Sequence, residues 1–354
     1  MSPSIRFPEF TGEWKNTTLE ECVDFLDGQR KPIKSDDRKG EKRLYPYYGA
    51  SGIIDYIDEY IFDGDYILLS EDGANIIDRN YRVAFIANGK IWVNNHAHVL
   101  QPHKEMNINF LSEALERINY AIYNTGTTMP KLNQEICRKI NLNVPSLSEQ
   151  NKIGNLLYLL NERIATQNRL IDRLQSLMIG IAQKIAHSNK PNVRIFDCLE
   201  CSSSALQESE VNKTGKYPVY GANGIVGYID KYHTQNEAIY IIKDGSGVGG
   251  VSYVTGKCSS TGTLNILQAK NGHSLKYLYY LLKVFNFVPY KTGMAIPHIY
   301  FKDYGKAKIF CPAYPEQLEY AKLLSSIDGN LRIALDSLKN FNLQKQYLLR
   351  HMLI

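Results

Sequence analysis

The sequence contains two diverged copies of one module, and this duplication restricts the possible folds more than any other feature. Residues 45–58 read YPYYGASGIIDYID and residues 217–230 read YPVYGANGIVGYID, so that ten of fourteen positions are identical. The similarity continues in two later pairs of segments, 125–133 with 292–300 and 143–150 with 310–317. Since internal repeats of this kind indicate duplicated structural units, the pattern excludes the common enzyme plan of two unlike domains.

Each copy begins with short apolar runs that glycine, asparagine and aspartate interrupt, as turns between strands require. The runs are 66–70, 82–87 and 91–93 in the first copy and 238–242, 250–255 and 264–268 in the second. Helical spacing of apolar residues follows at 108–124 and 273–285. We therefore expect each module to be α+β.

After each module, apolar residues recur at alternating steps of four and three, which is typical of a coiled-coil seam. These positions are Ile153, Leu157, Leu160, Ile164, Ile171, Leu174 and Met178 after the first module, with Gln167 as the polar position among them, and Leu324, Ile327, Leu331, Leu338 and Phe341 after the second. We interpret Gln167 as a device that sets the register. Ser146 and Glu149 have the spacing of a capping box, which predicts the start of the first long helix.

The order of these segments predicts the domain organisation. Short connections favour antiparallel pairing of the two helices, so we expect two pseudo-twofold-related α/β recognition domains separated by an antiparallel coiled coil of two long helices. The predicted ranges are 1–145 for the first recognition domain, 146–188 for the first helix, 189–312 for the second domain and 313–354 for the second helix.

Composition narrows the class of protein without identifying a partner. The net charge of +5 is compatible with nucleic-acid binding but not diagnostic of it. No run of eighteen apolar residues occurs and the N-terminus lacks a signal-peptide pattern, so we expect a cytoplasmic protein with no membrane association. The six cysteines are expected to be free thiols. Cys198 and Cys201 form a lone CxxC, and because no second pair follows, we expect no metal site.

Motifs for catalysis are weak. The stretch GSGVGG at 245–250 matches a dinucleotide fingerprint, but the strand-like VSYVTGK follows it where a helix should begin, so we interpret it as a turn between strands. His96 and His98 are expected on one face of a half-exposed strand. The sequence carries no P-loop, nucleophile elbow or HExxH, and we expect neither a catalytic residue nor a cofactor-binding residue in this chain.

Basic and polar residues at expected turns and strand ends are the candidates for DNA contacts. The block 28–43, with Arg30 and Lys31, contains seven Lys/Arg, and it either contacts phosphates or is a solvated loop. Further candidates are Arg79, Arg82, Lys90 and Lys131 in the first module and Lys243, Ser246, Lys257, Lys291 and His298 in the second. Because the loops differ between the copies, we expect the two modules to read two unlike sequences, whereas identical modules would read a palindrome.

The sequence resembles the specificity subunit of type I restriction–modification systems in four features taken together. These are the two YP-x-YGA-x-GI segments, the Gly-x-x-x-Pro segments at 126–130 and 293–297, the Pro-x-x-x-Glu-Gln starts of both long helices and the closing YLLRHMLI. The resemblance implies that each module reads one half of a split DNA site. It also implies that the helices set the gap and dock two modification subunits, which use S-adenosylmethionine to methylate adenine. Restriction subunits that translocate DNA complete such a complex, and S-adenosylmethionine, Mg and ATP are expected in the partner subunits alone.

By position, the resemblance places the DNA-facing surface at 125–133 and 292–300, which adds Thr127 and Asn133 to the candidates. Lys131 and its counterpart His298 differ, so the two modules need not use this position alike. Two alternatives remain: a scaffold subunit with a duplicated domain that reads no DNA, and an enzyme in which GSGVGG is a cofactor loop.

Overall fold

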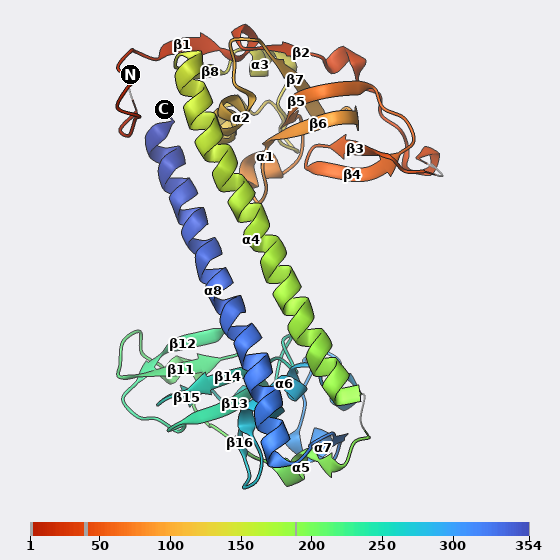
Figure 1. The fold of residues 1–354 in the computed structure, drawn as a ribbon, viewed down its shortest axis with the longest axis vertical. Helices are drawn as coiled ribbons and strands as arrows, with labels where there is room; N and C mark the ends of the chain where they lie inside the picture. Colours follow the sequence, from red (N-terminus) through yellow and green to blue (C-terminus); the bar gives the residue numbers. More distant parts are fainter. Residues whose placement is uncertain (1–2, 39–41, 188–189, 354) are drawn as a thin grey trace. The chain divides into compact units, whose positions relative to one another are not determined.

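The computed structural model describes residues 3–38, 42–187 and 190–353. The chain divides into two units, and the division passes through both long helices: unit 1 comprises Met1–Gln167 with Ser337–Ile354, and unit 2 comprises Asn168–Asp336 (Figure 1). Each unit therefore contains one copy of the module together with one part of each long helix. None of the described helices combines the length and the apolar composition needed to cross a membrane.

Unit 1 contains a six-stranded sheet with the order β2-β7-β5-β6-β3-β4 and a separate two-stranded ladder of β1 and β8. The strands are β1 (Lys15–Thr18), β2 (Val23–Phe25), β3 (Tyr45–Gly49), β4 (Gly52–Ile57), β5 (Phe62–Ser70), β6 (Ala84–Val93), β7 (Ala97–Pro102) and β8 (Asn141–Val144). The helices are α1 (Asn75–Asp78), α2 (Ile108–Arg117) and α3 (Gln134–Arg138), with 3-10 turns η1 (Leu19–Glu21), η2 (Asp27–Gln29), η3 (Ser35–Asp37) and η4 (Tyr120–Tyr123).

Unit 2 repeats this plan. Its strands are β9 (Val193–Arg194), β10 (Leu199–Ser203), β11 (Tyr217–Gly221), β12 (Gly224–Ile229), β13 (Glu237–Ile242), β14 (Val251–Thr255), β15 (Ser259–Ser260), β16 (Leu264–Ala269) and β17 (Lys308–Ile309). Its helices are α5 (Ile195–Cys198), α6 (Leu275–Lys283) and α7 (Phe301–Tyr304), with 3-10 turns η5 (Glu208–Glu210) and η6 (Val288–Tyr290). The orders β10-β16-β13-β14 and β12-β11-β15 follow the order of the six-stranded sheet, with its β6 replaced by two strands.

Strand β6 corrects one sequence expectation. Residues 82–87 and 91–93 were expected to form separate strands, but β6 runs from Ala84 to Val93 and pairs with β5 along most of its length. Gly89, which has a φ of 72°, lies inside this strand opposite Gly64. In unit 2, the break that the turn residues indicate does occur, because β14 and β15 are separate.

The helices α4 (Leu147–His187) and α8 (Tyr314–Met352) are the predicted long helices. In unit 1, Ile153 and Leu157 of α4 are buried in one cluster with Met352 of α8. Further along α4, the Arg163 guanidinium lies 6.0 Å from the centroid of the Phe341 ring. Residue numbers that rise on α4 therefore meet falling numbers on α8, and the two helices are antiparallel in this unit (Figure 1).

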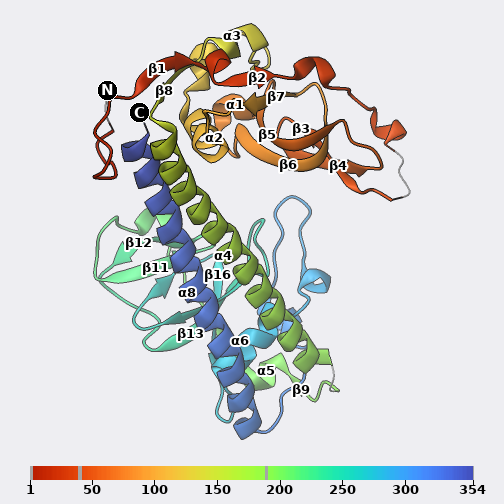
Figure 2. The same cartoon turned by 45° about the horizontal axis from the view of Figure 1, so that its top comes forward.

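The predicted seam positions face inward. On α4, Ile153, Leu157, Leu160, Ile171 and Met178 are buried and Ile164, Gln167 and Leu174 are half-buried; on α8, Leu324, Ile327 and Leu331 are buried and Leu338 and Phe341 are half-buried. In unit 2, α6 lies beside both long helices (Figure 2), and its Tyr280 lines one groove with Met178 and Leu331. The 4/3 spacing is thus confirmed as a buried stripe. Residues 188 and 354, the predicted ends of the two helices, lie outside the described residues.

The start of α4 is capped differently from the expectation. The Glu149 amide donates to Ser146 Oγ at 3.4 Å, as a capping box requires. The Glu149 carboxylate, however, accepts two hydrogen bonds from the Arg6 guanidinium, both 2.6 Å long. Half of the predicted capping box is therefore present, and an ion pair to the N-terminal segment replaces the other half.

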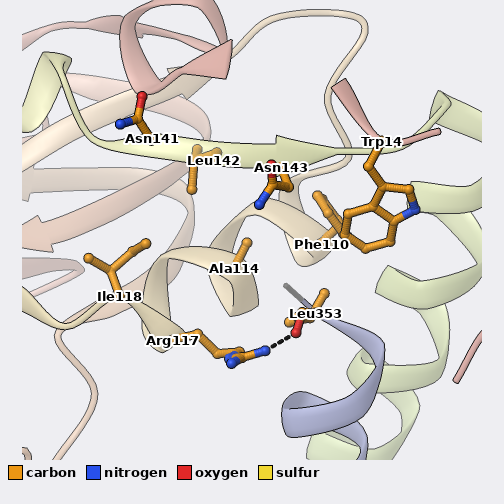
Figure 3. A pocket seen from close by; sticks show the side chains of 9 residues that line it. All are labelled: Trp14, Phe110, Ala114, Arg117, Ile118, Asn141, Leu142, Asn143 and Leu353. Carbon is orange, nitrogen blue, oxygen red and sulfur yellow. Dashed lines mark hydrogen bonds between the residues drawn. The ribbon is translucent and has the colours of Figure 1, made fainter. Parts of the chain in front are cut away.

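The last turn of α8 contacts helix α2 of module 1. Arg117 of α2 donates a hydrogen bond to the carbonyl oxygen of Leu353 (Figure 3) and another to that of Leu349. Leu349 lies in the last turn of α8, whose carbonyls lack partners within the helix, and Leu353 directly follows this helix. Trp14 and Phe110 line the adjoining cavity of about 100 Å³. The contacts fix the end of α8 to α2.

Candidate nucleic-acid interface

An anchored loop follows η4 in module 1 and spans residues 125–131. The Thr125 amide and hydroxyl donate to the carbonyl oxygen of Lys131, at 2.9 and 3.1 Å, and close the loop on itself. The Gly73 amide then donates to the Pro130 carbonyl at 3.0 Å, and the Leu132 amide donates to the Glu71 carbonyl at 2.7 Å. These bonds attach the loop to the turn that follows β5.

Module 2 builds the same anchored loop at residues 292–298. The amides of Thr292 and Gly245 donate to the carbonyls of His298 and Pro297, at 2.9 and 3.0 Å. The Ile299 amide donates to the Lys243 carbonyl at 2.9 Å. Because each bond has its counterpart in module 1, the backbone scaffold is shared and the side chains distinguish the two loops.

The glycine of each anchored loop is required by close backbone contacts. A Cβ at Gly126 would lie 1.8 Å from the Met129 carbonyl oxygen. A Cβ at Gly293 would lie 2.4 Å from the Ile296 carbonyl oxygen, and its φ of 86° is a conformation that favours glycine. The shared Thr-Gly pair therefore specifies the loop geometry.

The tips of the anchored loops carry exposed apolar side chains. Met129 is 59% exposed, Ile296 is 58% exposed and Met294 is fully exposed. Binding residues concentrate on loops that a scaffold holds in position. Such side chains can meet thymine methyl groups and sugars in a DNA groove.

Several of the predicted DNA-binding residues gather at these loops. They are exposed or half-buried, and they comprise Thr127, Lys131 and Asn133 in module 1 and Lys243, Ser246, Lys291 and His298 in module 2. Asn133 directly precedes α3 and Ser246 lies in the turn after β13. The stretch 245–250 is a turn between β13 and β14, as its sequence predicts.

Beneath the anchored loop of module 1 lies a network of charged groups. The Arg30 guanidinium donates to Glu71 at 2.7 Å, and Lys131 Nζ lies 3.5 Å from the other Glu71 oxygen. His98 is fully buried, and its Nδ1 lies 2.6 Å from an Asp27 oxygen. Burial alone would lower the pKa of His98, but its interactions with Asp27 and Cys137 raise it to about 10.

The network corrects the expectation for the two histidines. His98 lies inside β7 and is buried, whereas His96 precedes the strand, is half exposed and has its Nδ1 2.8 Å from Asp72. They do not share one half-exposed face. Asp27, Glu71 and His98 bring one ligand atom each within 4.8 Å of one another, and His98 Nδ1 lies 2.6 Å from Asp27 and 3.8 Å from Glu71.

Module 2 has different charges at the same positions. Lys243 replaces Glu71, and Asn265, which donates to the Tyr304 hydroxyl at 3.1 Å, replaces His98. His298 Nδ1 lies 2.8 Å from Asp244. The two modules therefore present opposite charge at one position next to a shared loop.

Two predicted DNA-binding residues, Arg79 and Arg82, lie away from the anchored loop. The guanidinium of Arg79 lies 2.8 Å from Glu116, and that of Arg82 lies 2.6 Å from Glu113, both on α2. Such bonds hold the β5–β6 connection onto α2. The geometry of these ion pairs does not require DNA, so the DNA contacts of Arg79 and Arg82 remain a prediction from the sequence.

Lys90 and Lys257 also lie apart from the anchored loops but occupy equivalent places. Lys90 Nζ is 4.6 Å from the centroid of the Tyr60 ring, and Lys257 Nζ is 4.8 Å from that of Tyr232. Both cations lie over an aromatic face, an attraction typical of lysine and tyrosine. Lys31 is exposed, and its carbonyl accepts from the Trp92 indole at 2.6 Å. Residues 39–41 of the basic block lie outside the described residues.

The hairpin β3–β4 adds residues that the sequence argument did not include in the site. Ile53 and Ile54 are each 47% exposed and Tyr56 is 45% exposed, while Ile225 in the equivalent hairpin is 52% exposed. The near-identity of the two hairpin sequences was visible as a repeat. The exposure of their apolar residues was not, because it depends on which face of the strand packs on the sheet.

Comparison with known proteins relates the whole chain to one family. The family model described as type I restriction modification DNA specificity domain matches residues 11–176 and again residues 192–340. A putative type I restriction enzyme specificity subunit of Haemophilus influenzae is 27% identical, with 95% of each protein covered.

Two solved structures share the fold. The S subunit of a type I restriction–modification system from M. genitalium has a TM-score of 0.78 at 17% identity, and the match covers 100% of this chain and 99% of that chain. A chain from a structure that concerns complex assembly and conformational transition of the type I system has a TM-score of 0.50 at 14% identity, with 96% and 97% covered.

Proposed function

The chain belongs to the family of the type I restriction–modification DNA specificity domain and is a specificity subunit with two recognition domains, and from this premise we propose that each domain reads one half of a bipartite, asymmetric DNA site. The observation that carries the proposal is the pair of anchored loops. Their backbones are held by matching hydrogen bonds, while Glu71 and Lys243 differ in charge beside them. A shared scaffold with unlike side chains suits two unlike half-sites.

In this proposal, different side chains perform different tasks. Exposed lysines such as Lys131 and Lys291 contact phosphates and set the position on the duplex, a contribution that falls with salt. The loop tips and the exposed hairpin residues enter the grooves and distinguish bases. The charge network under the module 1 loop holds Lys131 and Arg30 in place through Glu71.

We also propose that the long helices set the spacer and dock two modification subunits. Large apolar residues remain exposed on them, and in unit 1 Leu159 and Tyr347 are 53% and 55% exposed and line one groove with Leu160. In unit 2, Ile179, which is 45% exposed, lines a groove with Met178 and Tyr280. Exposed apolar grooves of this kind suit the attachment of protein partners.

The chemistry of methylation and cleavage then belongs to other subunits. The glycine-rich turn at 245–250 leads into strand β14, so it offers no helix N-terminus for a pyrophosphate. We propose that S-adenosylmethionine, Mg and ATP bind the modification and restriction subunits, and that this chain contributes recognition without a catalytic step.

The two loop glycines provide the test. The complex of this chain with its modification subunits would methylate a library of duplexes in which either half of the target site is randomised. Gly126→Ala should relax or abolish selection in one half alone, and Gly293→Ala should do so in the other half, so that each variant is the control for the other. Equal effects on both halves, or none, would refute the assignment of one half-site to each loop and favour a scaffold role.

A further inference from the structure

Three potential metal ligands from distant parts of module 2 meet below α6. They are Cys198 at the end of α5, His273 just before α6, and Cys311 in the connection from β17 to α8. Their two sulfur atoms and one imidazole nitrogen all lie within 4.8 Å of one another. Cys198 is fully buried and Cys311 is 8% exposed. Cys201, the other half of the CxxC, is not part of this group.

One atom of the group lacks a partner. His273 Nδ1 is buried and accepts or donates no hydrogen bond within the described residues. A buried polar atom without a partner destabilises the folded chain, so its presence calls for a ligand. A cation coordinated by Nδ1 would give this nitrogen a partner.

Module 1 shows what the same three positions hold when they serve packing alone. The Cys22 carbonyl accepts from the His103 amide at 2.9 Å, as the Cys198 carbonyl accepts from the Lys270 amide at 2.9 Å. By this correspondence Cys22 occupies the place of Cys198.

The other two positions correspond in the same way. The Met106 amide donates to the His103 carbonyl just before the N-cap of α2, as the His273 amide donates to the Lys270 carbonyl before the N-cap of α6. Val144 ends β8 where Cys311 follows β17. Met106 and Val144 pack against the apolar cluster that contains Cys22. Apolar side chains thus fill this place in module 1, and module 2 has a thiol and an imidazole instead.

We propose that Cys198, His273 and Cys311 bind one zinc ion. Two thiolates and an imidazole are ligands that Zn²⁺ takes, whereas Ca²⁺ and Mg²⁺ take oxygen ligands. Tetrahedral Zn–S bonds of about 2.3 Å place two sulfurs roughly 3.8 Å apart, a separation within the limit observed here. Water supplies the fourth ligand, and both thiols release their protons to solvent on binding.

The ion fastens three segments of unit 2 to one another. These are the first helix of module 2, the N-terminus of α6 and the connection that leads into α8. The Asn192 side chain already holds Cys311 in place, because it donates to the Cys311 carbonyl and accepts from the Cys311 amide, at 2.7 and 2.8 Å. All three ligands belong to module 2, so the site concerns this module alone.

The test uses the full chain, purified with a phosphine reductant and loaded with Zn²⁺ or with Co²⁺. We expect one zinc per chain by elemental mass spectrometry after dialysis, and a thiolate-to-cobalt charge-transfer absorption in the near ultraviolet. Cys311→Val introduces the residue that module 1 tolerates at this position, so the variant should fold, which circular dichroism checks. It should lower the bound metal and the cobalt absorption at least tenfold.

Two further variants make the test specific. His273→Met should weaken zinc binding as well, while Cys201→Ser should leave one ion per chain. Absence of stoichiometric metal in the unmodified chain, or metal retained in Cys311→Val, would each overturn the proposal.

Discussion

The buried carboxylate of Glu113 joins module 1 to both long helices within unit 1, and its removal should destabilise this unit. Glu113 on α2 is 3% exposed. It accepts from Arg82 at 2.6 Å and from Asn161 of α4 at 2.8 Å, and Lys345 Nζ of α8 lies at 3.5 Å. Burial would raise the pKa of Glu113, but the two cations lower it overall, so the carboxylate is charged at neutral pH.

Glu113→Gln keeps the volume and leaves two cations without their anion. Breaking a buried ion pair costs about 3–5 kcal/mol, and exposed pairs are worth about 0–1 kcal/mol. Arg82 is 33% exposed and gains water, whereas Lys345 is 18% exposed. We therefore expect a loss of about 2–3 kcal/mol. Since 1 kcal/mol moves the midpoint of a domain of 150–250 residues by about 2–4 °C, the melting midpoint should fall by roughly 5–10 °C.

Calorimetry of the full chain, with hydrogen exchange of the α2 amides to identify unit 1, measures this loss. The matched control is Glu9→Gln, since Glu9 pairs with Lys152 at the surface and should leave the midpoint unchanged. Lys345→Gln added to Glu113→Gln should restore part of the loss. The folded pKa of Glu113 lies below its ordinary value, so the difference between the two proteins should vanish as the pH falls through that pKa. An unchanged midpoint at neutral pH would refute the reasoning.

Two further predictions concern His98 and Gly154. Because the pKa of His98 is raised to about 10, its contribution to stability is complete below its unfolded pKa of about 6.5 and is lost as the pH rises through 10. An NMR titration should show the imidazole charged at pH 8, and Asp27→Asn should lower the pKa of His98. A Cβ at Gly154 would lie 2.3 Å from the Asn107 oxygen that caps α2, so Gly154→Ala should destabilise the chain by about 1–2 kcal/mol in denaturant titration. At Gly180, where no described atom beyond the chain neighbours and the helix's own backbone lies within 4 Å of the added Cβ, alanine should stabilise the chain by up to about 1 kcal/mol. Equal effects at the two glycines would contradict the packing argument.

The architecture was predictable because two sequence patterns, the 4/3 apolar spacing and the internal repeat, extend over many residues. The 4/3 spacing extends over many turns, so single exceptions such as Gln167 could not hide it, and the seam positions are indeed buried or half-buried. The repeat predicted two modules of one fold, and the equivalent ladders β1–β8 and β9–β17 confirm it. The family resemblance inferred from the repeated motifs is likewise confirmed by the match over most of the chain.

Patterns within a few residues predicted the structure less reliably, because contacts with residues far away in the sequence decided the local structure and the burial. The residues Asn88 to Lys90 indicate a turn, yet pairing with β5 keeps them inside β6. His98 looked like a polar strand residue, and its burial depends on Asp27, a partner that sequence spacing does not reveal. Arg82 looked like a surface cation, and its partner Glu113 lies on a helix later in the chain. The DNA contacts of the predicted residues remain predictions.

The most direct test of the central account is a map of N6-methyladenine across the genome of cells that carry the gene for this chain and its modification subunits, with and without that gene. The account predicts that methylation disappears at one split motif with two unlike halves and a fixed gap. An identical methylation map in both strains, with the modification subunits expressed, would contradict it.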